Sequence, residues 1–216
     1  MKWSRQTEPR VDLFTADSSQ FIQKSALPTP TNLCLSKSFL QNIIVNDDEH
    51  NLLIAQQVAH ILQEKSPPIL TERTEHLQRI HEKLAAQGIE HIFILKGGLG
   101  KKALKEIHGQ LEQLPDSTPR VILATGKYVD EGFDDPKLDP LFLVAPISWK
   151  GTLQQYTGRL HRLYEGKTEV RIYDYVDDDS PVLASMFCKR LTGYRSMAYE
   201  IDYSEQPRLD LKNNQG

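Results

Sequence analysis

The residues in this chain best placed to do chemistry are two arginines, Arg159 and Arg162, which stand three positions apart. Side chains at that spacing lie on one face of a helical turn, so both guanidinium groups can point at the same ligand. Each guanidinium offers a planar fork of donors that matches phosphate oxygens. Gln155 and Gly158 precede the pair. Such a pair taken alone is usually solvated or bonded to a neighbour such as Glu165. The surrounding motifs therefore determine whether the pair is interpreted as a phosphate-binding site.

A second group lies about thirty residues upstream, around Thr125 and the run from 131 to 134. A threonine hydroxyl at the end of a strand can bond a phosphate. Gly132 lets a backbone approach a ligand closely, and the carboxylate of Asp134 can accept a hydrogen bond from a ribose hydroxyl. The alternative is an acidic surface loop with ordinary turn residues.

The glycine run that starts at Gly97 and Gly98 resembles a phosphate loop, but its spacing is wrong. Such a loop needs a glycine where this chain has Leu95, and a hydroxyl residue where it has Lys102. No magnesium-holding loop is therefore expected. Two interpretations stay open: a plain strand-to-helix turn, or backbone amides and Lys101 that touch a nucleic-acid phosphate at a helix start.

Composition excludes several classes of site. The 216 residues carry a net charge of -3, so the overall charge of the chain does not indicate nucleic-acid binding. No metal site is predicted, because His76 and His81 are five positions apart and Cys34 and Cys188 are too few for zinc. The chain shows no secretory leader and no long apolar run, so we expect a cytoplasmic protein without a membrane segment.

The elements that must position these residues follow from the hydrophobic pattern. Helices are expected over about 47–65, 74–86, the glycine turn to 111, 151–163 and 182–194, and strands over 69–71, 92–95, 121–124, 141–144 and 170–176. Short continuous apolar runs that alternate with helices are typical of a parallel sheet covered on both faces. In such α/β sheets ligands bind at the carboxyl ends of the strands. Gly88 is expected to end its helix as a C-cap glycine.

The domain boundaries follow from breaks in this pattern. Residues 1–45 are expected to be an irregular arm or connector, because Pro28 and Pro30 interrupt them and the run 17–20 is polar. A single α/β domain is expected over 46–203. The polar residues 204–216 are expected to be a flexible tail.

The order of these motifs resembles the second, C-terminal RecA-like domain of superfamily 2 DEAD/DEAH-box helicases. The run 155–162 is similar to their motif VI, 124–134 to motif V and 70–77 to motif IV. The runs 131–139, 146–155 and 186–194 look most like bacterial helicases described as type III restriction Res-subunit-like. The resemblance covers about residues 45–200 and implies a parallel sheet between helices.

The resemblance also implies roles for particular residues. It assigns catalytic roles, with one arginine finger on the γ-phosphate of ATP, to Arg159, Arg162 and Gln155. It assigns further ATP contacts to Gly132, Asp134 and Gly158. It assigns contacts with the nucleic-acid backbone to Thr125 and, less directly, to Thr71, Gly97, Gly98 and Lys101.

One departure from the family is large. The 216 residues hold no counterpart of the first RecA-like domain, which carries the phosphate loop and the magnesium box. ATP and Mg²⁺ are therefore expected only in a complete two-domain assembly, and the isolated chain is not expected to hydrolyse ATP. The expected partners are single-stranded or duplex DNA, with RNA left open, and a first RecA-like domain or a nuclease or primase partner in another chain.

Two rival interpretations remain. The chain could be a non-catalytic nucleic-acid-binding or partner-docking fragment derived from a helicase. It could also be a generic doubly wound enzyme that binds a nucleotide by itself, although the imperfect glycine loop argues against that.

Overall fold

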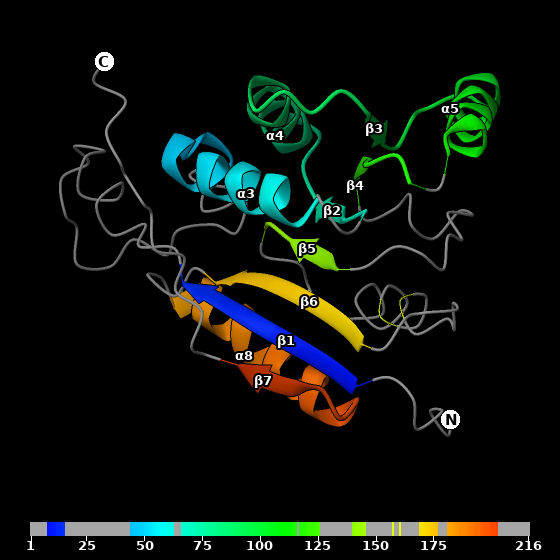
Figure 1. Ribbon diagram of the computed structural model, residues 1–216. Helices are drawn as coiled ribbons and strands as arrows, with labels where there is room; N and C mark the ends of the chain where they lie inside the picture. Colours follow the sequence, from blue (N-terminus) through cyan, green and yellow to red (C-terminus); the bar gives the residue numbers. More distant parts are fainter. Residues whose placement is uncertain are drawn as a thin grey trace, which may run out of the picture.

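The computed structural model describes residues 8–15, 44–62, 66–115, 117–125, 140–145, 157, 160, 169–176 and 181–202. They form one seven-stranded sheet in the order β3-β4-β2-β5-β6-β1-β7, with helices on both faces (Figure 1). Every pair of neighbouring strands is parallel. The predicted parallel α/β architecture is confirmed.

The observed elements have these bounds. The strands are β1 (Glu8–Thr15), β2 (Pro68–Thr71), β3 (Ile92–Leu95), β4 (Val121–Thr125), β5 (Leu141–Leu143), β6 (Glu169–Val176) and β7 (Glu200–Asp202). The helices are α3 (Asp48–Ile61), α4 (Thr74–Ala86), α5 (Lys101–Gln113) and α8 (Pro181–Ser196). Most of the helix predicted over 151–163 lies outside the described residues, although Thr157 and Leu160 are helical.

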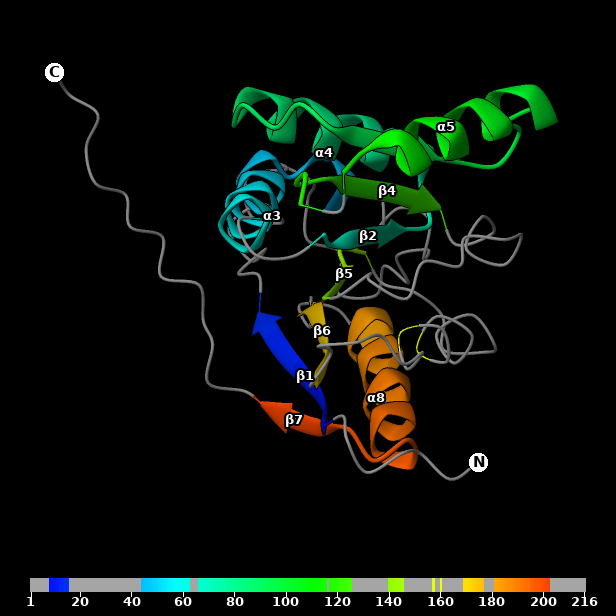
Figure 2. The ribbon, with the colours of Figure 1, turned by 45° about the vertical axis from the view of Figure 1, so that its right-hand side comes forward.

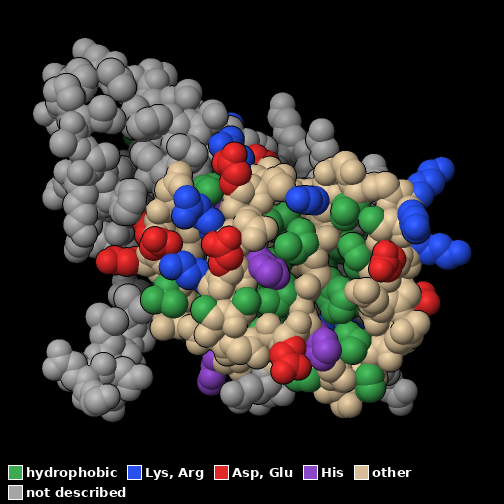
Figure 3. Space-filling view, turned by 90° about the horizontal axis from the view of Figure 1, so that it is seen from above, with side chains coloured by type: hydrophobic (Ala, Val, Ile, Leu, Met, Phe, Trp, Pro, Cys, Tyr) green, Lys and Arg blue, Asp and Glu red, His purple; other side chains and the backbone are tan. Residues whose placement is uncertain are grey.

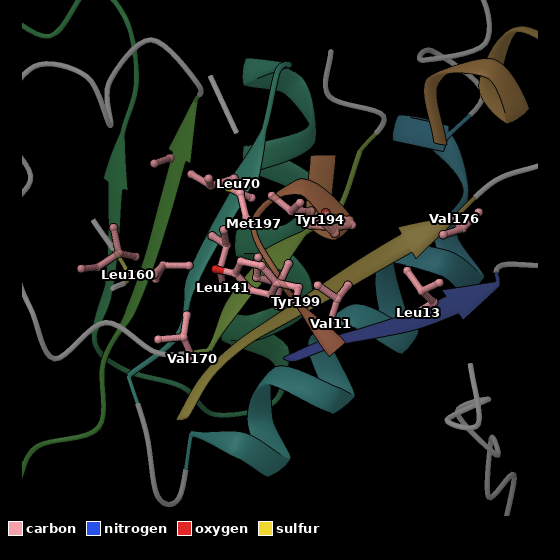
Figure 4. Packing of buried hydrophobic residues seen from close by; sticks show 14 of the residues in the cluster. Val11, Leu13, Leu70, Leu141, Leu160, Val170, Val176, Tyr194, Met197 and Tyr199 are labelled. Atoms are coloured by element: carbon pink, nitrogen blue, oxygen red, sulfur yellow. The ribbon is translucent and has the colours of Figure 1, made fainter. Parts of the chain in front are cut away.

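The two faces of the sheet pack against different helices, as the two ribbon views show (Figures 1 and 2). The α3–α4 core is built from residues including Ile54, Val58, Ile69, Leu77, Ile80, Leu84 and Phe142. The α5–α8 core lies on the opposite face and is built from residues including Val11, Leu13, Leu70, Leu141, Val170, Ile172 and Tyr194 (Figure 4). Successive strand residues point to opposite faces, so strands covered on both sides read as continuous apolar runs.

Strand β1 corrects the prediction of an irregular arm over residues 1–45, which is wrong for residues 8–15. β1 lies inside the sheet, between β6 and β7. Val11 and Leu13 belong to the α5–α8 core and are almost completely buried. The short strand β7 was also not predicted.

The opposite face of β1 explains why its sequence looks unlike a strand. Arg10 Nε donates to Asp12 Oδ1 at 2.7 Å, and Arg10 also pairs with Asp202 of β7. Arg171 of β6 lies 3.5 Å from the second carboxylate oxygen of Asp12. These charges are balanced by side chains more than 150 positions away, so the local sequence alone looks polar and irregular.

The end of α4 confirms the predicted C-cap glycine. Gly88 has a φ of 80°, in the left-handed region that favours glycine. Its N–H donates to the carbonyl of Ala85 at 3.0 Å, and Ile89 N–H donates to the carbonyl of Leu84 at 3.3 Å. This hydrogen-bond pair, with Leu84 and Ile89 both on the α3–α4 core, is a Schellman motif.

A buried polar cluster joins α8 to β6. Arg190 Nε donates to Asp174 Oδ2 at 2.7 Å, and the Tyr194 hydroxyl donates to the same oxygen at 2.9 Å. Arg190 is 2% exposed, and Asp174 and Tyr194 are fully buried. Burial raises the pKa of Tyr194 well above its ordinary value. The cluster therefore ties α8 to β6.

Within the described part of the chain, no helix is both long enough and apolar enough to cross a membrane.

Candidate nucleic-acid interface

The carboxyl ends of β3, β4 and β2 lie next to one another and carry the predicted nucleic-acid residues. Thr71 and Thr125 are the last residues of β2 and β4, and they are register partners. β3 lies on the other side of β4, and the turn with Gly97 and Gly98 follows it. The parallel topology therefore brings these four residues to one edge.

The glycine turn is tied to the end of β4. Gly97 N–H donates to Thr125 Oγ1 at 3.3 Å, and the Thr125 side chain is largely buried. Gly98 has a φ of 87°, which a side chain would disfavour. The Thr125 hydroxyl thus holds the turn after β3 in place.

The helix that follows this turn concentrates positive charge at its start. Lys101, Lys102 and Lys105 are exposed, and the first turn of α5 contains no acidic residue. Gly100 occupies the N-cap and has no side chain that could cap the first backbone N–H groups of α5. Basic side chains gather at the right-hand end of the upper face, where α5 lies (Figure 3). The positive end of a helix dipole disfavours nearby lysines and favours a bound anion.

Thr71 is placed differently from the prediction of a nucleic-acid contact. It is 0% exposed, and its hydroxyl lies 3.0 Å from His76 Nδ1. The same oxygen accepts a hydrogen bond from Arg73 N–H at 3.3 Å. Its side chain therefore offers no exposed atom to a ligand, and it holds the turn behind the surface.

His76 has a role inside the fold that is not among the sequence-based predictions. It is fully buried, and its Nε2 lies 2.8 Å from Asn51 Oδ1 of α3. Burial, followed by the positive charges of His50 and Arg79, lowers the pKa of His76 from 6.5 to about 3. The available signal was its position on the apolar face of α4, with Leu77, Ile80 and Leu84.

The depressed pKa of His76 predicts acid sensitivity in a defined window. Between pH 6.5 and about pH 3, His76 is protonated in the unfolded state but neutral in the folded state. The free energy of unfolding should therefore fall by about 2 kcal/mol between pH 7 and pH 5 from this residue alone. Urea unfolding midpoints measured across that range give the slope.

The matched variant for this prediction is His76→Gln, which keeps a polar side chain but cannot titrate. It should be less stable than the wild-type protein at pH 7 and lose less stability on acidification. Parallel pH curves for the two proteins would show that His76 does not carry the effect.

The residues predicted to bind ATP lie outside the described residues: Gln155, Gly158, Arg159, Arg162, Gly132 and Asp134. Two positions within the arginine-bearing run are described. Thr157 is fully buried and donates a hydrogen bond from Oγ1 to Met197 Sδ at 3.3 Å. Leu160 belongs to the α5–α8 core, as does Met197 (Figure 4).

The described residues at this edge do not suit a magnesium ion. No group of three or more His, Cys, Asp or Glu side chains in the described ranges could hold a metal. The edge offers glycine amides, a threonine hydroxyl and lysine ammonium groups, which are donors for an anion. Its chemistry therefore fits phosphate and not the cation.

Comparison with known sequences gives one informative relative. No protein-family model matches the chain. A curated protein of Saccharomyces cerevisiae, "Putative ATP-dependent helicase IRC3", is 26% identical over 178 residues. The alignment covers 80% of this chain and 24% of the yeast protein, so the chain spans about a quarter of that relative.

Several solved structures share the fold. T4 UvsW matches with a TM-score of 0.68 at 13% identity, covering 92% of this chain and 41% of that chain. The C-terminal domain of the DEAD-box protein Dbp5 matches with a TM-score of 0.60 at 12% identity, covering 93% and 91%. Saccharomyces cerevisiae Dbp5 bound to RNA and ADP BeF3 matches with a TM-score of 0.59 at 11% identity, covering 92% and 41%. These likenesses confirm the predicted RecA-like fold.

Proposed function

We propose, on the premise that this chain has the fold of a helicase C-terminal RecA-like domain, that it is the second half of an ATP-driven nucleic-acid helicase or translocase. In this proposal it supplies arginines to ATP and one part of the surface that binds a single strand. DNA is the proposed substrate. The observation that carries the proposal is the Gly97–Thr125 hydrogen bond, which holds a glycine turn beside three exposed lysines at one strand edge.

The chemistry of that edge supports a phosphate backbone as the ligand. Uncapped N–H groups at the start of α5 and the Gly98 backbone can donate to phosphate oxygens. Lys101 adds a mobile positive charge beside them. Contacts of this kind position a nucleic acid without reading its bases, as a translocating motor requires.

The burial of two residues supports the assignment of the arginines to the nucleotide. In the helix that the sequence predicts over 151–163, the positions of Gln155, Arg159 and Arg162 share one face. Thr157 and Leu160, which are both buried, fall on the order of 160° around the helix from that face. The helical periodicity of the sequence therefore predicts the two arginines on the face opposite these buried positions.

The catalytic part of the proposal needs a second component. A phosphate loop and Mg²⁺ held by a first RecA-like domain would bind the phosphates and polarise them. Arg159 or Arg162 would then stabilise the charge that develops on the transferred phosphoryl group. Closure of the cleft between the two domains would couple that contact to the grip on the strand. The isolated chain would then bind nucleic acid without hydrolysing ATP.

The lysines of α5 give the direct test of the nucleic-acid surface. The triple variant Lys101→Ala, Lys102→Ala and Lys105→Ala should weaken binding to a fluorescent single strand. The slope of log affinity against log salt should become shallower by about 2, because each phosphate that a lysine neutralises adds roughly 0.7 to its magnitude. Fluorescence anisotropy with DNA and RNA oligonucleotides at several salt concentrations gives both quantities and the preferred substrate.

Lys189→Ala is the matched control, because this exposed lysine lies on α8. Alanine is a strong helix former, so none of these changes should unfold the protein. An unchanged salt slope in the triple variant would remove α5 from the interface.

The rival candidate is a non-catalytic nucleic-acid-binding or partner-docking module. It predicts the same dependence on the lysines but no effect of ATP in any assembly. The substitution of Arg159 therefore separates the two.

A further inference from the structure

We infer that a buried hydrogen-bond relay through His76 fixes the turn after β2 and makes His76 a positioning residue for the proposed nucleic-acid surface. The relay runs from α3 through α4 to the end of β2, by way of Asn51, His76 and Thr71. Its last step, the effect on nucleic-acid binding, rests on the proposed function.

The direction of every hydrogen bond in the relay follows from its first member. Asn51 Nδ2 donates to the carbonyl oxygen of Val45 at 3.0 Å. The amide oxygen of Asn51 is therefore the atom that faces His76 Nε2 at 2.8 Å. An amide oxygen only accepts, so His76 Nε2 must carry the proton.

The second half of the relay follows from this tautomer. A neutral imidazole protonated at Nε2 has a lone pair at Nδ1, so the Thr71 hydroxyl donates to it at 3.0 Å. The Thr71 oxygen can then accept the Arg73 N–H at 3.3 Å. A single arrangement of protons satisfies the four hydrogen bonds.

Water cannot reach the relay to replace a hydrogen-bond partner that is removed. Asn51, His76 and Thr71 are each 0% exposed. Loss of one partner would leave a buried donor or acceptor unsatisfied, which is costly in the protein interior. The relay is therefore a rigid connection between two helices and the strand end.

The connection ends at the proposed interface. Arg73 is the N-cap of α4 and has an extended backbone, and its own side chain makes no capping hydrogen bond. Thr71, which accepts from the Arg73 N–H, is the register partner of Thr125. Each threonine holds a turn of the same edge: Thr125 holds Gly97, and Thr71 holds Arg73. The relay anchors the second of these turns to α3 and α4, so the edge is preorganised for its ligand.

The test uses two substitutions at one position. Thr71→Val keeps the shape of the side chain and removes the hydroxyl, whereas Thr71→Ser keeps the hydroxyl. In the folded full chain, Thr71→Val should speed hydrogen exchange of the Arg73 amide by at least about tenfold and weaken single-strand DNA binding by roughly three- to tenfold. The salt slope should stay unchanged, since every lysine that meets a phosphate is still present. Thr71→Ser should restore both quantities.

Nitrogen NMR of the His76 ring in the wild-type chain gives a second measurement that needs no variant. It should show the tautomer protonated at Nε2, and a proton at Nδ1 would overturn the relay. A folded Thr71→Val protein with unchanged DNA affinity would overturn the positioning role. A wild-type chain that binds neither DNA nor RNA would overturn the proposed function and with it the positioning role, while the tautomer and the Arg73 amide would still decide whether the relay exists.

Discussion

Replacing Arg159 with alanine is expected to reduce nucleic-acid-stimulated ATP turnover at least about a thousandfold when the chain is assembled with a first RecA-like domain. The reason is electrostatic: the guanidinium would meet charge that develops only in the transition state of phosphoryl transfer. Turnover should fall without a matching loss of single-strand affinity, since the proposed strand contacts lie on the β3–α5 turn and α5. Steady-state ATP hydrolysis with and without single-stranded DNA measures the effect.

Arg195→Ala is the control for this substitution, because Arg195 is an exposed arginine near the end of α8. It should leave turnover unchanged. Equal turnover in the Arg159→Ala and wild-type assemblies would contradict the arginine-finger role. Turnover by the isolated chain that disappears in Arg159→Ala would contradict the need for a partner, and would make the glycine run that begins at Gly97 the next candidate for a phosphate loop.

Removal of the Asp174 carboxylate is expected to be among the most destabilising single changes in the described part of the chain. Asp174→Ala leaves the buried Arg190 guanidinium and the Tyr194 hydroxyl without the oxygen that accepts from both. Breaking a buried ion pair in this way costs about 3–5 kcal/mol. A domain of this kind is stable by only about 5–15 kcal/mol, so a large share would be lost. Urea unfolding should show a lower midpoint with an unchanged slope.

Two companion variants separate the charge from the packing. The double variant Asp174→Leu with Arg190→Met replaces the pair by apolar side chains and should recover most of the lost stability. Tyr194→Phe removes one hydrogen bond and should cost only about 1 kcal/mol. A double variant as unstable as Asp174→Ala would show that packing, not an uncompensated charge, dominates at this position.

Much of the fold could be predicted because parallel strands buried on both faces leave a direct trace in sequence. Strands such as β4 are continuous apolar runs, and Gly88 marks a helix end by its conformational freedom. β1 left no such trace, since Arg10 and Asp12 are stabilised by charges on β6 and β7. Partners that far along the chain cannot be identified from a local pattern.

In the candidate site, too, some features could be predicted from the sequence and others could not. The common edge of Thr125 and Gly97 could be predicted, because parallel topology puts all carboxyl ends of strands together. The burial of Thr71 could not be predicted, because it depends on how α3 and α4 pack around the end of β2. A threonine that contacts a ligand and one that donates to a buried histidine look identical in the sequence.

The place of β1 between β6 and β7 also determines the order in which the chain can fold. β1 is the first described strand along the sequence, yet Glu8 pairs with Glu169 and Arg10 with Glu200. The half of the sheet from β3 to β5 can form from its own strands, whereas β1 can pair only after β6 and β7, which lie far later in the sequence, have been made. Contacts this distant carry a large loop-closure entropy before they contribute any stability, which slows folding. Until then the apolar side chains of Val11 and Leu13 cannot be buried in the α5–α8 core. The nascent chain therefore exposes an apolar segment that we expect chaperones to bind.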